Sequence, residues 1–366
     1  MRALSKQSPV TVLIVDDSSF MRMTIQRILG QDPLIKVIDS ARDGLEGIEK
    51  LKALNPQVVV MDVEMPRMNG LRALEEIMRW QPTPVVILSA SAAEEGQLTL
   101  QALELGAIDA VVNPTLGRSS ELTESARDLI EKVKGAALVD LKRMKARMGR
   151  EGLALTGRGK QPEKKGRKSS LPEFPVELVA IGTSTGGPPA LQAVLSKLPA
   201  DFPVPVIVAQ HMPAGFTAPL AQRLDRLCPL NVQEAAQGDV LRPGSVYIAP
   251  AGLQMQVQRK QNQLTLMIGK ETPVTTIYKP SVDVMFLSAA REIGAGSCCV
   301  IMTGMGNDGL QGTREVKAQK GFVIAEAEES CVVYGMPKAV IEAGLADRIA
   351  PLPEIAKTMI ECIMRR

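Results

Sequence analysis

The sequence is poor in aromatic residues and in histidine. Aromatic side chains make up 3% of the 366 residues, which excludes the stacking surfaces that proteins use to bind single-stranded nucleic acid. The net charge of +3 is too small to indicate a nucleic-acid or membrane partner. A single histidine, His211, excludes a site built from several histidines. Any chemistry that needs an imidazole must therefore use His211.

The sequence also lacks cysteines at the spacing of metal or redox sites, and it lacks long apolar runs. The five cysteines show no C-x-x-C spacing, and Cys298 and Cys299 are adjacent, which indicates buried thiols in a reducing compartment. The apolar run near the N-terminus, residues 10–15, is too short for a signal peptide core or a membrane span. These absences predict a soluble cytoplasmic protein that does not insert into a membrane.

What the sequence does contain is a regular alternation of short apolar runs and helical patterns, which is typical of parallel α/β sheets. The first 115 residues predict five strands, over 10–15, 35–39, 58–61, 84–88 and 109–112. Helical patterns lie between them, over 18–30, 44–54, 70–80 and 92–105, and a further helix follows near 121–147. This order predicts a doubly wound domain.

A second α/β pattern begins at residue 176. Its predicted strands lie over 177–181, 204–210, 245–249, 298–302 and 322–325. The 23 residues from 150 to 172 hold seven basic residues with Gly, Pro and Ser and show no hydrophobic period, which indicates a flexible linker. A nucleic-acid-binding tail is the alternative. The predicted organisation is a first domain over 1–148, a basic linker over 149–173 and a second, largely parallel domain over 174–366.

Acidic and hydroxyl residues stand at the ends of strands in the first domain. Asp16 and Asp17 follow the first strand, Asp62 ends the third and Ser89 the fourth. The carboxyl ends of parallel strands open onto one crevice. Three carboxylates there repel one another unless a cation lies between them, and oxygen ligands of this kind suit Mg²⁺. One carboxylate could then attack a phosphoryl group, whereas a single aspartate could simply cap a helix.

The glycine-rich stretch IGTSTGG, residues 181–187, lies between a predicted strand and a predicted helix. Three interpretations fit this context. The loop could cradle a phosphate on its N–H groups, or it could be a plain turn. It also satisfies the pattern G-x-S-x-G, which holds a nucleophilic serine on a sharp turn, here Ser184.

Residues at two more strand ends favour the interpretation of Ser184 as a nucleophile. His211 ends the next strand, and Asp308 lies just beyond the strand CCVIM. If these strands are parallel neighbours, Ser184 attacks, His211 accepts its proton and Asp308 fixes the imidazole tautomer. The glycines of TGMGNDG, residues 303–309, allow a tight turn that exposes N–H groups to an oxyanion. The order Ser–His–Asp differs from that of the α/β-hydrolases.

Four motifs of the first domain, VLIVDDSSFMR, VVVMDVEMPRMNG, VVILSAS and VVNPT, resemble the receiver domain of two-component response regulators. The resemblance implies a five-stranded, flavodoxin-like fold. It also implies that a histidine kinase of the chemotaxis pathway phosphorylates this domain. It further implies a phosphoacceptor, a switch hydroxyl and a set of magnesium ligands. These are Asp62 as phosphoacceptor, Ser89 as switch residue, and Asp16, Asp17 and Asp62 as ligands of Mg²⁺.

The first domain departs from the receiver pattern at two positions. Asn113 stands where the family has lysine, and Ala110 stands where an aromatic switch residue is common. Both departures predict that phosphorylation is only weakly coupled to activation.

The second domain carries IGTSTGG, QHMPAGFT, PSVDVMF, TGMGNDG and SCVVYGMP. Together these motifs resemble the catalytic domain of the chemotaxis protein-glutamate methylesterases, the CheB family. The resemblance implies hydrolysis of glutamate methyl esters on the cytoplasmic helices of chemoreceptors and deamidation of receptor glutamines, without a cofactor for the esterase reaction. Ser184, His211 and Asp308 fall on the triad positions of the family, and Thr185 and Met305 fall on positions associated with the oxyanion.

Gln254 stands where relatives often carry histidine, so His211 is left as the imidazole base. Two other functions compete with this one. A regulatory module could bind a nucleotide through IGTSTGG, but the loop lacks both G-x-G-x-x-G and Gly-Lys-Ser/Thr. A transcriptional response regulator would need a helix-turn-helix pattern after the linker, and none is evident.

Overall fold

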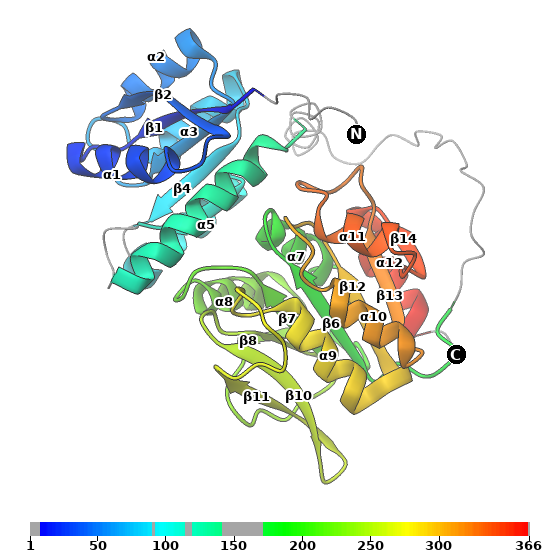
Figure 1. The fold of residues 1–366 in the computed structure, drawn as a ribbon. Coiled ribbons are helices and arrows are strands. Elements are labelled where there is room, and N and C mark those ends of the chain that lie inside the picture. Colours follow the sequence, from blue (N-terminus) through cyan, green and yellow to red (C-terminus); the bar gives the residue numbers. More distant parts are fainter. Residues whose placement is uncertain (1–7, 90–91, 114–118, 141–170, 365–366) are drawn as a thin grey trace. The chain divides into compact units, whose positions relative to one another are not determined.

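The computed structural model describes residues 8–89, 92–113, 119–140 and 171–364, and it divides into two compact units, Met1–Gly152 and Leu153–Arg366 (Figure 1). The predicted linker over 149–173 lies almost wholly outside the described residues, as does Pro114 of the VVNPT motif. The exact domain boundaries therefore stay predictions, and each unit is described by itself.

The first unit is a five-stranded parallel sheet in the order β2-β1-β3-β4-β5. Helices α1 and α5 contact each other on one face, whereas α2, α3 and α4 lie along the other. The strands are β1 (Val10–Val15), β2 (Ile35–Ala41), β3 (Val58–Asp62), β4 (Val85–Ser89) and β5 (Asp109–Val112). The helices are α1 (Ser19–Leu29), α2 (Gly44–Leu54), α3 (Gly70–Trp80), α4 (Ala92–Glu104) and α5 (Ser119–Ala137).

The starts of three helices in this unit follow from their capping residues. Ser18, Asp43 and Asn69 each adopt extended backbone and accept a hydrogen bond from an N–H of the first helical turn. Such caps satisfy donors that a helix start otherwise leaves unpaired. Because the strand order reverses between β1 and β3, the carboxyl ends of these two strands open a crevice. The predicted doubly wound fold is confirmed.

The second unit contains a seven-stranded parallel sheet in the order β14-β13-β12-β6-β7-β9-β8. Helix α7 contacts α8 and α12 on one face, and α10 contacts α9 and α11 on the other. The strands are β6 (Leu178–Thr183), β7 (Val206–Gln210), β8 (Asn231–Glu234), β9 (Ser245–Ile248), β12 (Ser297–Ile301), β13 (Phe322–Glu326) and β14 (Arg348–Ala350). The helices are α7 (Gly187–Leu195), α8 (Thr217–Leu227), α9 (Val282–Ile293), η1 (Gly294–Gly296), α10 (Leu310–Ala318), α11 (Met336–Glu342) and α12 (Leu352–Ile363).

An antiparallel hairpin that the sequence analysis did not predict follows β9. It consists of β10 (Gln254–Lys260) and β11 (Gln263–Gly269), joined by Gln261 and Asn262, which both have positive φ. Met255, Val257 and Leu266 bury the apolar side of this hairpin in the core of the unit. The period-two alternation of Gln254–Lys260 was the signal that could have found it.

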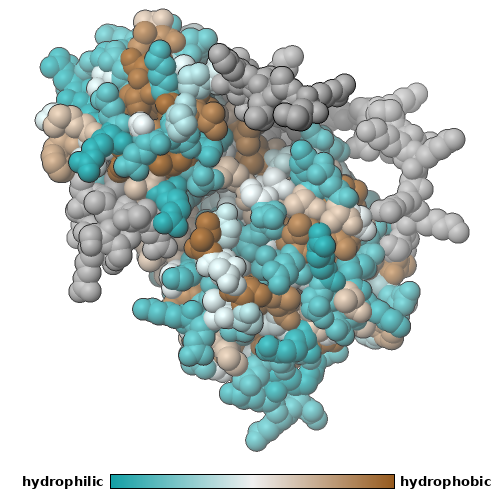
Figure 2. Space-filling model, in the orientation of Figure 1, coloured by the Kyte–Doolittle hydropathy of each residue, from teal (hydrophilic) through white to brown (hydrophobic). Residues whose placement is uncertain are grey.

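The faces visible in Figure 2 are mainly hydrophilic, with scattered apolar patches on each unit. Large apolar side chains such as Phe202, Phe216 and Phe286 are fully buried in the core, whereas Trp80, Phe20 and Met23 are exposed. Among the residues that the structure describes, no helix combines the length and the apolar character needed to cross a membrane.

Candidate functional site

The loop IGTSTGG forms the turn between β6 and α7. Ser184 directly follows β6, and its N–H donates to the carbonyl of Thr303 (3.0 Å), beyond the end of β12. Its own carbonyl accepts from Gly187 N–H (2.8 Å) and from Gln210 Nε2 at the end of β7 (2.9 Å). Gly186 has φ +77°, a conformation that favours glycine. The turn is therefore bonded to both neighbouring strands, and Ser184 is nearly buried within it.

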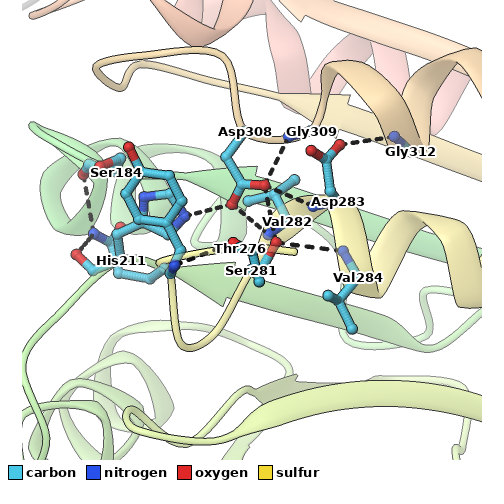
Figure 3. Close-up of polar contacts among 12 residues, drawn as sticks. Ser184, His211, Thr276, Ser281, Val282, Asp283, Val284, Asp308, Gly309 and Gly312 are labelled. Carbon is cyan, nitrogen blue, oxygen red and sulfur yellow. Dashed lines mark hydrogen bonds and ion pairs between the residues drawn. The ribbon is translucent and has the colours of Figure 1, made fainter. Parts of the chain in front are cut away.

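The imidazole of His211 lies between Ser184 and Asp308 (Figure 3). His211 directly follows β7, and its N–H donates to Thr183 O (3.1 Å). Its Nε2 lies 2.7 Å from Asp308 Oδ2. Its Nδ1 is buried and has no hydrogen-bond partner among the described residues. Because a carboxylate can only accept, Nε2 carries the ring proton and Nδ1 keeps its lone pair.

Five hydrogen-bond donors surround the carboxylate of Asp308. The donors to its two oxygens are His211 Nε2, Ser281 Oγ and the N–H groups of Val282, Asp283 and Gly309, at 2.7–3.1 Å (Figure 3). Burial acts to raise the pKa of Asp308, but the hydrogen bond from His211 and the N–H groups of Asp283 and Val282 outweigh it and lower the pKa. Asp308 is therefore ionised at neutral pH.

A second carboxylate, Asp283, supports this arrangement from the first turn of α9. It accepts a hydrogen bond from the Gly312 N–H (2.7 Å), one of the unpaired donors in the first turn of α10, which follows the Asp308 loop. Burial, opposed by the Gly312 bond and helped by the charge of Asp308, raises the pKa of Asp283 to about 6. The sequence analysis quoted the motif PSVDVMF but gave no role to Ser281 or Asp283, which both hold the Asp308 loop.

The two predicted oxyanion residues lie on loops beside Ser184. Thr185 is buried, and its carbonyl accepts from Thr303 Oγ1 (3.0 Å). Met305 follows Gly304, whose N–H donates to Val333 O (3.1 Å). A Cβ atom on Gly304 would lie 2.7 Å from the Ser184 Cβ, so only glycine allows this approach. Both loops reach the nucleophile, and the role of their N–H groups stays a prediction.

The first unit brings its predicted acidic residues together. One carboxylate oxygen from each of Asp16, Asp17 and Asp62 lies within 4.8 Å of the others. Asp16 is buried, and its Oδ2 has no partner among the described residues. Burial and, to a lesser degree, the charge of Asp17 raise the pKa of Asp16 to about 6, against a hydrogen bond from Ser18 N–H. A buried oxygen without a donor fits a cation such as Mg²⁺.

The remaining receiver residues lie at the same edge of the sheet. Ser89 ends β4 and is buried, and its carbonyl accepts from Asn113 N–H (2.8 Å), just beyond β5. Lys132 of α5 is a buried lysine that the sequence analysis missed, paired with Asp109 at 3.2 Å. Asp109 begins β5, at the opposite end from Asn113. Lys132 therefore cannot take the place of the lysine that is absent at position 113.

Comparisons with known proteins identify the families that the two units resemble. Residues 179–359 match the family model CheB methylesterase, and residues 12–134 match the response regulator receiver domain. A protein-glutamate methylesterase/protein-glutamine glutaminase of Desulfitobacterium hafniense is 57% identical over 98% of this chain and 99% of its own length. The protein of the same name from Moorella thermoacetica is 42% identical over 97% and 98%. The crystal structure of the Thermotoga maritima CheB methylesterase catalytic domain is 42% identical, covering 52% of this chain and all of its own, with a TM-score of 0.50.

The raised pKa of Asp16 and the predicted Mg²⁺ site together set how the free energy of unfolding of the first unit depends on pH and on Mg²⁺. Without metal, the folded state holds more protons than the unfolded state between the ordinary aspartate pKa of 3.8 and about 6, so stability falls as pH rises through that window. At pH 7.5, Mg²⁺ at 100 times its dissociation constant should add about 2.7 kcal/mol and raise the Tm by roughly 5–10 °C.

Scanning calorimetry of the full chain with Mg²⁺ or with EDTA tests this expectation. Asp16→Asn should raise the metal-free Tm and remove most of the Mg²⁺ effect, whereas the exposed Glu49→Gln should change neither. An Mg²⁺ effect in Asp16→Asn as large as in the wild type would contradict the assignment.

Gly304→Ala should displace Ser184, because the new methyl group overlaps the Ser184 Cβ and the Met336 Sδ. A nucleophile that moves by about 1 Å is expected to react about 100-fold more slowly. The rate at which a fluorophosphonate labels Ser184 measures this directly. Gly269→Ala is the matched control, since nothing lies within 4 Å of its Cβ position. Equal labelling of both variants would show that the close approach at Gly304 is unimportant.

Proposed function

The chain belongs to the CheB family of protein-glutamate methylesterases with an amino-terminal receiver domain, and on this premise we propose that Ser184, His211 and Asp308 form its catalytic triad. The proposed substrates are glutamate methyl esters on chemoreceptors, with receptor glutamines as substrates for deamidation. The observation that carries the proposal is the 2.7 Å bond from the single histidine of the chain to Asp308, at the ends of neighbouring parallel strands.

In the acylation step, His211 Nδ1 takes the proton of Ser184 while the serine oxygen attacks the ester carbonyl carbon. Ionised Asp308 stabilises the imidazolium that forms. The N–H groups of Thr185 and Met305 are proposed to stabilise the negative charge that develops on the carbonyl oxygen. The imidazolium then gives its proton to the leaving methoxide, and methanol departs.

In the second step, His211 Nδ1 removes a proton from water, whose oxygen attacks the carbonyl carbon of the glutamyl ester of Ser184. The bond from that carbon to Ser184 Oγ then breaks, the imidazolium returns its proton to Ser184 Oγ, and the glutamate side chain is freed as a carboxylate. A glutamine substrate follows the same course with ammonia as leaving group. The hydrogen bond to Nε2 makes Nδ1 the base, the reverse of the serine protease arrangement, in which Nδ1 faces the aspartate.

The alternative of a nucleotide-binding loop is less well supported. The Gly187 N–H, which would face a phosphate in a cradle, instead donates to Ser184 O within the turn.

The receiver domain is proposed to regulate the esterase. Asp62 would accept a phosphoryl group from a chemotaxis histidine kinase, with Mg²⁺ held by Asp16, Asp17 and Asp62 to neutralise the charge. Ser89 is the proposed switch hydroxyl. The proposed place of action is the cytoplasm, where the receptor helices and the kinase are expected, with no nucleic-acid partner and no membrane insertion.

Ser184→Ala and His211→Ala should each lower methanol release from methylated receptor by about 10⁴-fold or more, because the nucleophile or its base is lost. Asp308→Asn should cost a similar factor, since its amide no longer favours the required tautomer. Far-ultraviolet circular dichroism checks that each variant is folded, and Ser196→Ala is the control. A His211→Ala variant with wild-type activity would exclude the triad, because no other histidine can replace it.

Asn113 predicts a weak response to phosphorylation. A lysine there would donate a charge-assisted hydrogen bond, roughly twice as strong as a neutral one, whereas an amide supplies no charge. A small phosphodonor should therefore activate the wild type weakly, and Asn113→Lys should increase the activation unless Ala110 has removed the relay as well.

Esterase rate against phosphodonor concentration measures this response, with Asp62→Asn as the unphosphorylatable control. Strong activation of the wild type that disappears in Asp62→Asn would show that the missing lysine is unimportant in this protein.

A further inference from the structure

An aromatic ring covers the catalytic imidazole. Tyr278 stacks on His211 with ring centroids 4.2 Å apart and planes 6° apart. Tyr278 lies in the loop that leads from β11 to α9, and it is half-buried. The stack shields one face of the imidazole from water and restricts rotation of the ring about its side-chain bond. It also places an aromatic face against the imidazolium that forms during catalysis, which is a favourable contact.

Tyr278 is in turn held by a buried amide, Gln254 at the start of β10. Gln254 is 1% exposed, and its Nε2 donates to the Tyr278 carbonyl (2.8 Å). Its Oε1 accepts from the Ser281 N–H (2.8 Å). One carboxamide therefore bonds both ends of the segment 278–281. A side chain with one donor and one acceptor group fits here, because one backbone partner is buried and the other is partly buried.

The same short segment reaches the acid of the triad. Ser281 Oγ donates to Asp308 Oδ1 (2.9 Å), and the Val282 N–H donates to Asp308 Oδ2 (2.7 Å). Residues 278–282 thus touch the base through the Tyr278 ring and the acid through two hydrogen bonds. This segment therefore contacts both partners of the hydrogen bond between His211 and Asp308.

We infer that Gln254 is a positioning residue for the esterase reaction, which acts through Tyr278 and Ser281 to hold the imidazole of His211 with Nδ1 toward Ser184. This inference rests on the proposed triad. It assigns Tyr278 as the second positioning residue, through its stacked ring. Neither side chain needs to touch the receptor, so their loss should lower kcat and leave KM nearly unchanged.

The test uses the full-length protein and two measurements, methanol release from methylated receptor and the rate of Ser184 labelling by a fluorophosphonate. Gln254→Met keeps the length of the side chain but leaves both backbone partners unpaired. It should lower kcat and the labelling rate by about 10–100-fold, with KM within about two-fold of the wild type. Gln256→Met is the matched control, two residues further along β10 and half-exposed, and should match the wild type.

Variants of Tyr278 separate a positioning role from a general loss of structure. Tyr278→Phe keeps the stacked ring and should retain nearly full activity, whereas Tyr278→Leu should lower kcat as Gln254→Met does. Because Gln254 acts in part through Tyr278, the double variant should lose less than the product of the two single losses. If Gln254→Met does not fold, Tyr278→Leu against Tyr278→Phe still decides whether the stacked ring matters.

Two results would overturn the inference: a kcat for Gln254→Met within about two-fold of the wild type, or fully multiplicative losses in the double variant. Ser184→Ala in the same assays distinguishes this failure from failure of the proposed function. An inactive Ser184→Ala with a fully active Gln254→Met leaves the triad intact and refutes only the role of Gln254. An active Ser184→Ala refutes both.

Discussion

The proposed catalytic site of the second unit depends on one hydrogen bond, from His211 Nε2 to Asp308 Oδ2 at 2.7 Å. This bond decides which imidazole nitrogen carries the proton and therefore which one can act as a base toward Ser184. A buried carboxylate is unstable unless donors surround it, and the loop of Asp308 and the start of α9 supply them. Glycine is required at position 304, because the loop after β12 there approaches Ser184 too closely for any side chain.

The two units place buried aspartates in opposite situations. Asp308 receives donors to both oxygens, and its pKa is lowered in spite of burial. Asp16 has an oxygen that meets no donor among the described residues, beside a second carboxylate, and burial raises its pKa to about 6. The first arrangement stabilises a permanent negative charge that serves the imidazole. The second leaves a charge that only a proton or a cation can neutralise, which is what a reversible Mg²⁺ site requires.

Most of the sheet could be predicted from the sequence, because buried parallel strands are apolar runs and helices have their own period. The short edge strands β8 and β14 and the hairpin of β10 and β11 were missed, since their burial patterns are weak or one-sided. The residues of the proposed triad could be named from the sequence because each follows a strand end. Gln254 and Tyr278 could not be given a role, because their contacts with residues 278–281 and with His211 depend on how a hairpin and a loop pack. The choice of Nε2 or Nδ1 depends on ring orientation, which no sequence pattern encodes.

The single histidine of the chain makes the central claim directly measurable. With ¹⁵N-labelled histidine, long-range ¹H–¹⁵N correlation spectra of the full-length protein show one imidazole, and they distinguish a protonated ring nitrogen from a bare one. At a pH where the imidazole is neutral, the structure predicts a proton on Nε2 and a bare Nδ1. A neutral imidazole with its proton on Nδ1 would contradict the account, because the base would then be turned away from Ser184.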